Sequence, residues 1–204
     1  FGSYFLSTQS YSKDHQQGFQ GLPEEYDIDL LRRLAAGEEE IDNPVPHLVY
    51  LDTETTGLAG GAGTFVFLVG LGYWTHNQDE KEFIVEQYFM RDYDEERALL
   101  TALDERFCIE QFSALVTYNG RRFDVPLLTT RYITNRQRGI LSRLPQIDVL
   151  YAVRRLWKLS HGDCSLGNIE REVLGVHREG DILGADIPQT YFQFVRGGDQ
   201  RRMI

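Results

Sequence analysis

Two acidic residues at the end of an apolar run could bind a metal ion. Asp52 and Glu54 stand two positions apart and directly follow the apolar segment 48–51. If this segment is a strand, side chains at i and i+2 point to the same face, so the two carboxylates lie together. Two such charges repel unless a cation lies between them, and Mg²⁺ or Mn²⁺ prefers carboxylate oxygens. The alternative is a simple turn, in which Gly57 supplies a positive φ.

A second string, residues 116–124, carries a third carboxylate. It reads Val-Thr-Tyr-Asn-Gly-Arg-Arg-Phe-Asp, and it ends a predicted strand at Asn119 and begins a predicted helix at Asp124. This order predicts that Asp124 lies at the end of a neighbouring strand. The alternative is that Asp124 only caps the helix, a role in which Asp is common.

Basic residues are concentrated in one part of an acidic chain. The formal net charge is −10, yet residues 121–158, hereafter the basic segment, carry +7 and the remainder carries −17. Eight of the nine basic residues in this segment are arginine, which forms forked hydrogen bonds with phosphate. The segment indicates a polyanion partner, although a solvated helix face explains such a run equally well.

The elements that must position these residues follow from hydrophobic spacing. Strands are predicted at 48–51, 64–74 and 83–89 as an antiparallel meander, and at 114–118; helices are predicted at 29–36, 94–107 (capped by Asp94), from 124, 148–157 (capped by Asp148), 165–173 (capped by Ser165) and 188–195. The order βββ, then αβα, then further helices predicts a mixed α/β domain. We expect residues 1–46 to form an acidic N-terminal extension and residues 47–204 to form the domain.

Composition excludes several classes of protein. The chain has 204 residues, of which 42% are hydrophobic, and its longest apolar run, residues 65–73, is too short to cross a membrane. Cys108 and Cys164 match neither a disulfide framework nor a zinc pattern. We therefore expect a cytoplasmic protein without a membrane partner.

Together the two strings resemble the motifs of the DEDD superfamily of 3′-to-5′ exonucleases, which have the ribonuclease-H-like fold. Asp52 and Glu54 match the first motif of that family, and Asn119, Phe123 and Asp124 match the second. The similarity runs from about His47 to the end of the chain. It is greatest to the bacterial branch of YprB-like ribonuclease-H-like domains.

The resemblance implies a two-metal nuclease acting on the 3′ end of DNA or RNA. Asp52, Glu54 and Asp124 would hold two Mg²⁺ or Mn²⁺ ions and carry the catalysis. The implied nucleic-acid contacts are Thr55, Thr56, Leu58, Asn119 and Phe123. Two of these have ordinary alternatives, because Leu58 could be a core leucine and Phe123 could pack the following helix onto the sheet.

One part of the family pattern is missing from the chain. A fourth carboxylate should follow a Tyr by four residues or a His by five, but Tyr191 is followed by Val195 and His161 by Leu166. The family layout places this motif after Ile204. A catalytically inactive nucleic-acid-binding module of the same fold therefore remains the alternative function.

Overall fold

The computed structural model describes residues 2–23, 25–34, 46–57, 63–75, 81–178, 180 and 182–197. Its main feature is a six-stranded mixed sheet with the strand order β1-β6-β5-β4-β7-β8. The strands are β1 (Phe5–Ser12), β4 (Leu48–Thr55), β5 (Val66–Trp74), β6 (Glu82–Phe89), β7 (Ala114–Thr117) and β8 (Gln146–Asp148). A separate two-stranded hairpin joins β2 (Gln16–Gln17) to β3 (Gln20–Gly21).

The sheet has an antiparallel half and a parallel half. β4, β5 and β6 form the predicted meander, in which Leu51 lies opposite Leu71. β7 and β8 then add in parallel next to β4, with Tyr50 opposite Val116. Because parallel neighbours end at the same edge of a sheet, the carboxyl ends of β4, β7 and β8 lie together. The prediction of a mixed α/β fold is confirmed.

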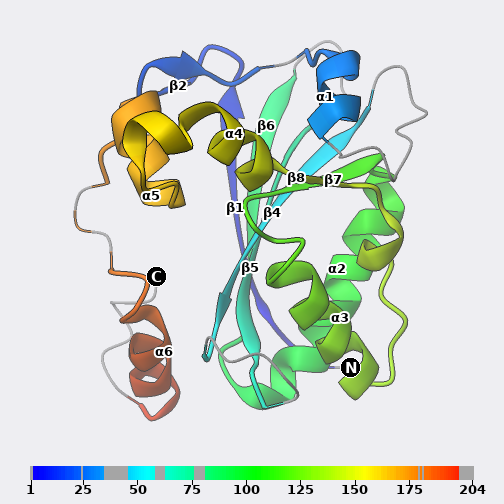
Figure 1. The fold of residues 1–204 in the computed structure, drawn as a ribbon. Helices are drawn as coiled ribbons and strands as arrows, with labels where there is room; N and C mark the ends of the chain where they lie inside the picture. The colour runs from blue at the N-terminus through cyan, green and yellow to red at the C-terminus, as the bar shows by residue number, and fades with distance from the viewer. Residues whose placement is uncertain are drawn as a thin grey trace.

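Helices α2 (Glu96–Glu110), α3 (Asp124–Thr134) and α6 (Ile187–Val195) contribute buried side chains to the main core on one face of the sheet. Figure 1 shows α2 and α3 beside the strands, with α6 apart from these two helices. The ring of Tyr191 in α6 is fully buried and stacks on Phe67 of β5 with 4.0 Å between centroids. Such aromatic burial is a large stabilising contribution, so α6 is part of the fold and not an appendage.

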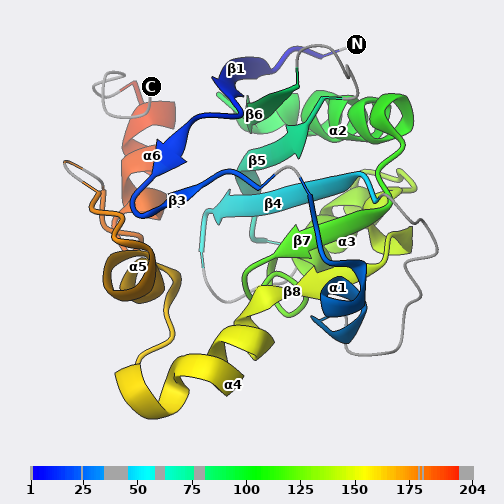
Figure 2. The same ribbon diagram turned by 90° about the horizontal axis from the view of Figure 1, so that it is seen from above.

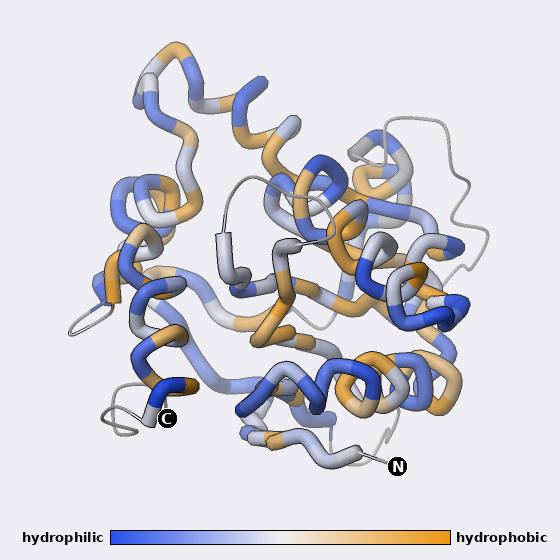
Figure 3. Tube along the Cα trace, turned by 90° about the horizontal axis from the view of Figure 1, so that it is seen from below, coloured by the Kyte–Doolittle hydropathy of each residue, from blue (hydrophilic) through white to orange (hydrophobic). Residues whose placement is uncertain are grey.

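The opposite face carries a smaller core. Leu48, Ala114, Val116 and Ile147 are covered there by side chains that include Leu31 of α1 (Ile28–Leu34). Helix α4 (Val149–His161) extends away from β8, and α5 (Leu166–Ile169) lies beyond it (Figure 2). Along the helices, hydrophobic and hydrophilic residues alternate, as expected for helices with one buried face (Figure 3).

Several predicted details need correction. Asp94 does not cap the helix predicted at 94–107, because Asp92 accepts the N–H of Tyr93 and begins a 3₁₀ turn, η1 (Tyr93–Glu95), before α2. Ser165 precedes α5, but its hydroxyl donates to Asp163 instead of accepting from the helix. A short π-helix, η3 (Glu170–Leu174), continues α5, and a 3₁₀ turn, η2 (Leu141–Arg143), precedes β8.

The predicted N-terminal extension contributes to the sheet. β1 pairs with β6 along its whole length, and the hairpin residue Phe19 donates its N–H to Leu174 at 2.7 Å. The predicted helix at 29–36 is present as α1 up to Leu34, and residues 35–36 lie outside the described part of the chain. These contacts join residues before His47 to the rest of the fold, at both the sheet and the end of η3.

Candidate active site at the carboxyl ends of the parallel strands

Asp52 and Glu54 lie on β4 itself, where the strand runs past its partner β7. The buried residues Leu48, Val49 and Leu51 hold the first half of β4 in the sheet, and the acids follow in its second half. The pairing between β4 and β7 ends at Tyr50. The two acids therefore project from the point where the sheet opens, on the same side of the strand.

The turn after β7 brings Asp124 to this point. Asn119 has a left-handed backbone with φ of 68°, which Asn adopts more readily than most residues. A Cβ atom added to Gly120 would lie 2.9 Å from Oδ2 of Asp124 and 2.6 Å from Cβ of Thr117, so no larger residue fits there without a shift. This Asn-Gly turn explains the spacing between strand and carboxylate in residues 116–124.

Thr53 joins the two motifs directly. Its hydroxyl donates a short hydrogen bond to Oδ1 of Asp124. Thr53 is the residue between Asp52 and Glu54, so the β4 motif and the start of α3 are fixed relative to each other. The sequence offered no signal for this contact, because the two residues are distant in the chain.

The environment of Asp52 and Asp124 disfavours negative charge. Solvent reaches Asp52, yet protein surrounds most of its carboxyl group. This burial raises the pKa of Asp52, and the charge of Asp124 raises the pKa further. Burial also raises the pKa of Asp124, and the charge of Asp148 adds to this, while the hydrogen bond from Thr53 lowers it. We call Asp52 and Asp124 the carboxylate pair. A cation beside this pair would relieve the repulsion.

Asp148 is a third acid at this edge, and its role is structural. Its carboxylate is buried and accepts backbone N–H groups from Asn119 at 2.7 Å, Arg121 at 3.2 Å and Leu150 at 3.1 Å. The predicted cap of α4 is confirmed by the last of these bonds. The first two hold the Asn-Gly turn in place, a function that cap spacing alone does not predict.

An ion pair borders Asp52 from the C-terminal half of the chain. Arg178 binds both oxygens of Glu170 in η3, at 2.8 Å and 2.6 Å. The charge of Arg178 lowers the pKa of Asp52, and that of Glu170 raises it. Neither residue belongs to a motif recognised in the sequence.

The carboxylate pair could hold a hard divalent ion. Within the described parts of the chain, no group of three or more His, Cys, Asp or Glu side chains is arranged to hold a metal. Glu54 is half-buried on β4 but does not complete such a group with the carboxylate pair. Mg²⁺ is commonly held by one or two carboxylates, with water and substrate phosphate as the other ligands, so two carboxylates are a sufficient anchor.

The residues predicted to contact nucleic acid differ from one another in their hydrogen bonds and exposure. The hydroxyl of Thr55 donates to the carbonyl of Gly57 at 3.0 Å, and that of Thr56 accepts the N–H of Phe65 at 2.9 Å. Both hydroxyls thus stabilise the end of the β4–β5 hairpin. Leu58 lies outside the described residues. Phe123 is 54% exposed directly before Asp124, so its ring does not pack α3 onto the sheet.

The basic segment is not a continuous surface. Arg131 is only 2% exposed and forms a forked ion pair with Glu96, with nitrogen–oxygen distances of 2.5 Å and 2.7 Å. Its guanidinium also lies over the ring of Phe65, 4.1 Å from the centroid. Arg154 and Lys158 of α4, in contrast, are exposed. Any polyanion contact must therefore use only part of the segment.

Two further expectations concern the cysteines and membrane-spanning segments. Cys108 is exposed and Cys164 is buried, and both are free thiols. No helix in the described ranges combines the length and the apolar character needed to cross a bilayer.

Comparisons with known proteins agree with the fold. The protein YprB of Bacillus subtilis (strain 168) is 39% identical over 154 residues, which are 74% of this chain. The chain spans only 35% of the length of that relative. The family B DNA polymerase of the hyperthermophilic archaeon Pyrobaculum calidifontis has a similar fold, with a TM-score of 0.56 and 16% identity over 80% of this chain and 23% of the polymerase.

The family follows from the sheet and from a match over most of the domain. A family model described as RNase_H superfamily matches residues 49–203, the region that contains the carboxylate pair and the strands from β4, except its first residue, to β8. The chain belongs to the RNase_H superfamily.

Proposed function

We propose that this domain is a divalent-metal-dependent nuclease, and most specifically a 3′-to-5′ exonuclease of DNA or RNA. The observation that carries the proposal is the carboxylate pair at the opened edge of the sheet. Its two acids come from the two motifs that resemble the exonuclease motifs, and the charge of Asp124 raises the pKa of Asp52. Membership of the RNase_H superfamily supports the same class of chemistry.

Each residue has a defined task in this proposal. Asp52 and Asp124 anchor the cation, and Glu54 is the candidate ligand for a second ion. Thr53 fixes Asp124 through its hydroxyl, and Asp148 fixes the Asn-Gly turn. The exposed ring of Phe123 is available to stack on a base. When bound, the metal supplies an activated water and offsets the charge that develops on the phosphate.

The alternative is a nucleic-acid-binding module that has the fold without catalysis. It is favoured by the missing fourth carboxylate motif and by the lack of a three-residue metal group among the described residues. This module would bind oligonucleotides in a salt-sensitive way and would leave them intact.

A gel time course separates these functions. We would incubate a 5′-labelled single-stranded oligonucleotide and Mn²⁺ with the protein extended to its encoded C-terminus. Asp52→Asn and the matched control Asp94→Asn, which removes an exposed acid of η1, would be tested next to it. The exonuclease predicts a ladder that shortens from the 3′ end, lost in Asp52→Asn and kept in Asp94→Asn. Cleavage of a circular strand would instead indicate an endonuclease, and an intact but bound oligonucleotide would indicate the binding module.

A further inference from the structure

A pocket of about 450 Å³ lies beside the Asn-Gly turn, between the end of β7 and helix α4. Its walls come from two places in the chain: Tyr118 and Asn119 after β7, and α4 with the loop that follows it, including Arg154, Lys158 and Cys164. None of these residues belongs to the carboxylate pair. We call this space the α4 pocket.

The elements that form the wall of the α4 pocket are connected by specific contacts. The hydroxyl of Tyr118 donates to the carbonyl oxygen of Cys164 at 2.5 Å, which ties the end of β7 to the loop after α4. Leu150, Val153, Cys164 and Ile169 form a small buried cluster behind it. The hydrogen bond and the cluster connect the end of β7, α4 and the loop that follows α4.

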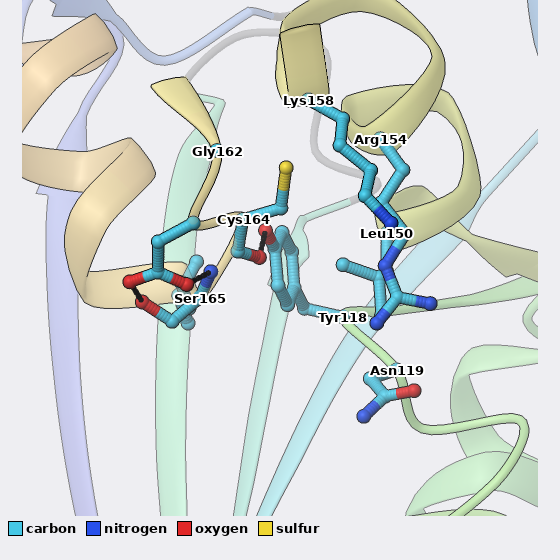
Figure 4. Close-up of a pocket in the computed structure, with 10 residues that line it drawn as sticks. Tyr118, Asn119, Leu150, Arg154, Lys158, Gly162, Cys164 and Ser165 are labelled. Carbon is cyan, nitrogen blue, oxygen red and sulfur yellow. Dashed lines mark hydrogen bonds between the residues drawn. The ribbon is translucent and has the colours of Figure 1, made fainter.

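Two cations on α4 face this space. Arg154 and Lys158 are four positions apart on the helix, so they lie on the same face, and Figure 4 shows both side chains extending toward Tyr118 and Asn119. Within the described residues, neither forms an ion pair. Two like charges at this spacing destabilise a helix slightly, and a bound anion would remove that cost.

The one acid in the wall, Asp163, forms no described ion pair with either of them. Both oxygens of Asp163 accept hydrogen bonds from Ser165, from its N–H at 2.9 Å and from its hydroxyl at 2.8 Å. Figure 4 shows Ser165 on the opposite side of the pocket from Arg154. The pocket therefore presents two cationic donors and the side-chain amide of Asn119 to one small volume.

The pocket and the carboxylate pair share the Asn-Gly turn. The side chain of Asn119 lines the pocket, while Gly120, the next residue, packs against the carboxylate of Asp124. A nucleic-acid strand that places one phosphate at the carboxylate pair would thus have a neighbouring part of its backbone near the pocket. We propose that Arg154 and Lys158 bind a backbone phosphodiester of that strand in the α4 pocket. This inference rests on the proposed function, because it requires a nucleic-acid strand at the carboxylate pair.

Equilibrium binding tests the inference without cleavage. Fluorescence anisotropy of a labelled single-stranded oligonucleotide, measured in EDTA over a series of salt concentrations, gives the Kd and its salt dependence. The variant is Arg154→Gln with Lys158→Gln. The matched control, Arg155→Gln with Lys13→Gln, removes the same two charges from exposed residues that do not line the pocket.

We expect the pocket variant to bind about tenfold more weakly than the wild type. The slope of log Kd against log salt should fall by about 0.7 for each phosphate that the variant no longer binds. The control should change Kd by less than about twofold, because only long-range charge is removed. The thermal unfolding of each variant, followed by circular dichroism, verifies that all of them are folded.

Each other result contradicts a specific claim. If the wild type binds but the pocket variant equals the control, the α4 pocket is not a phosphate site, while the proposed function stands. If the wild type neither binds nor cleaves an oligonucleotide at low salt, in EDTA or with added Mn²⁺, the proposed function and the inference both fail. If a nucleoside 5′-monophosphate competes as well per phosphate as the oligonucleotide, the pocket binds terminal phosphates and not the backbone.

Discussion

Arg131 on α3 and Arg154 on α4 come from the same basic segment but have opposite surroundings. Arg131 is buried between α3 and α2, where Glu96 binds its guanidinium with two hydrogen bonds and Asn135 donates to the same carboxylate at 2.7 Å. Arg154 is exposed and lines an open pocket. A buried charge must have its partner within the protein, whereas a solvent-exposed charge can bind an anion from solution. The comparison separates structural from ligand-binding arginines.

The largest expected effect on stability comes from removing the buried arginine, Arg131. Arg131→Met leaves the buried Glu96 without its cation, which should lower the free energy of unfolding by about 3–5 kcal/mol. Urea unfolding followed by circular dichroism measures this loss. In the double variant with Glu96→Leu, no unpaired charge remains, and much of the stability should return. A double variant as unstable as the single one would show that packing, and not charge, explains the loss.

Asp148 is an intermediate case between the buried Arg131 and the exposed Arg154. It is a buried carboxylate whose described hydrogen-bond donors are backbone N–H groups. Asp148→Ala removes a helix cap and two further hydrogen bonds, so unfolding should become easier by about 2–4 kcal/mol. Asp148→Asn keeps an acceptor oxygen and should lose less. Equal losses would mean that the negative charge itself is required. Amide hydrogen exchange at Asn119 and Arg121 should accelerate in the alanine variant.

Asp52 should give a smaller change of opposite sign. Its raised pKa means that the charged form is disfavoured in the fold, so this cost is present at neutral pH and disappears as the pH falls through that raised pKa. Asp52→Asn should therefore be more stable than the wild type at pH 7, by no more than about 0.5 kcal/mol because solvent screens the site.

The difference between Asp52→Asn and the wild type should vanish as the pH approaches about 4. Thermal unfolding at several pH values measures it, with Asp94→Asn as the control that should show no gain. Added Mg²⁺ should raise the Tm of the wild type more than that of Asp52→Asn. An equal rise in both would exclude Asp52 as a ligand.

The smallest effect on stability is expected from removing the exposed arginine, Arg154. Arg154→Gln should change the free energy of unfolding by less than about 0.5 kcal/mol, because the side chain is exposed and no described ion pair depends on it. The same urea experiment tests this. A loss comparable to that of Arg131→Met would show that Arg154 is structural, which would end the contrast between the two arginines.

The fold was predictable where hydrophobic runs are long. β5, with Phe67, Val69 and Leu71 buried, follows directly from composition. β8 has only three residues and β1 is mostly exposed, so neither has the alternation that identifies a strand. Both depend on pairing with strands already formed, and pairing between distant residues is not visible in local sequence.

The candidate site was predictable to a similar degree. Asp52 and Asp124 follow from their motifs, since Asp52 lies in the second half of a recognisable strand and Asp124 begins the helix that follows another. The hydrogen bond from Thr53 to Asp124 and the tie between Tyr118 and Cys164 both join residues far apart in the chain, so no local pattern predicts them. The burial of Arg131 was missed for the same reason, because its partner Glu96 belongs to another helix.

Strand β1 has a consequence for how the protein behaves in solution. It covers β6 from Phe89, opposite Phe5, to Glu82, opposite Ser12, and the ring of Tyr4 stacks on Tyr88 at 5.9 Å. Without it, β6 would be a free edge of eight residues, in which alternate residues would offer unpaired amide and carbonyl groups to any other chain. Such a free edge is the usual start of edge-to-edge aggregation. A chain shortened to begin at His47 should therefore self-associate, even though every motif of its candidate active site is intact.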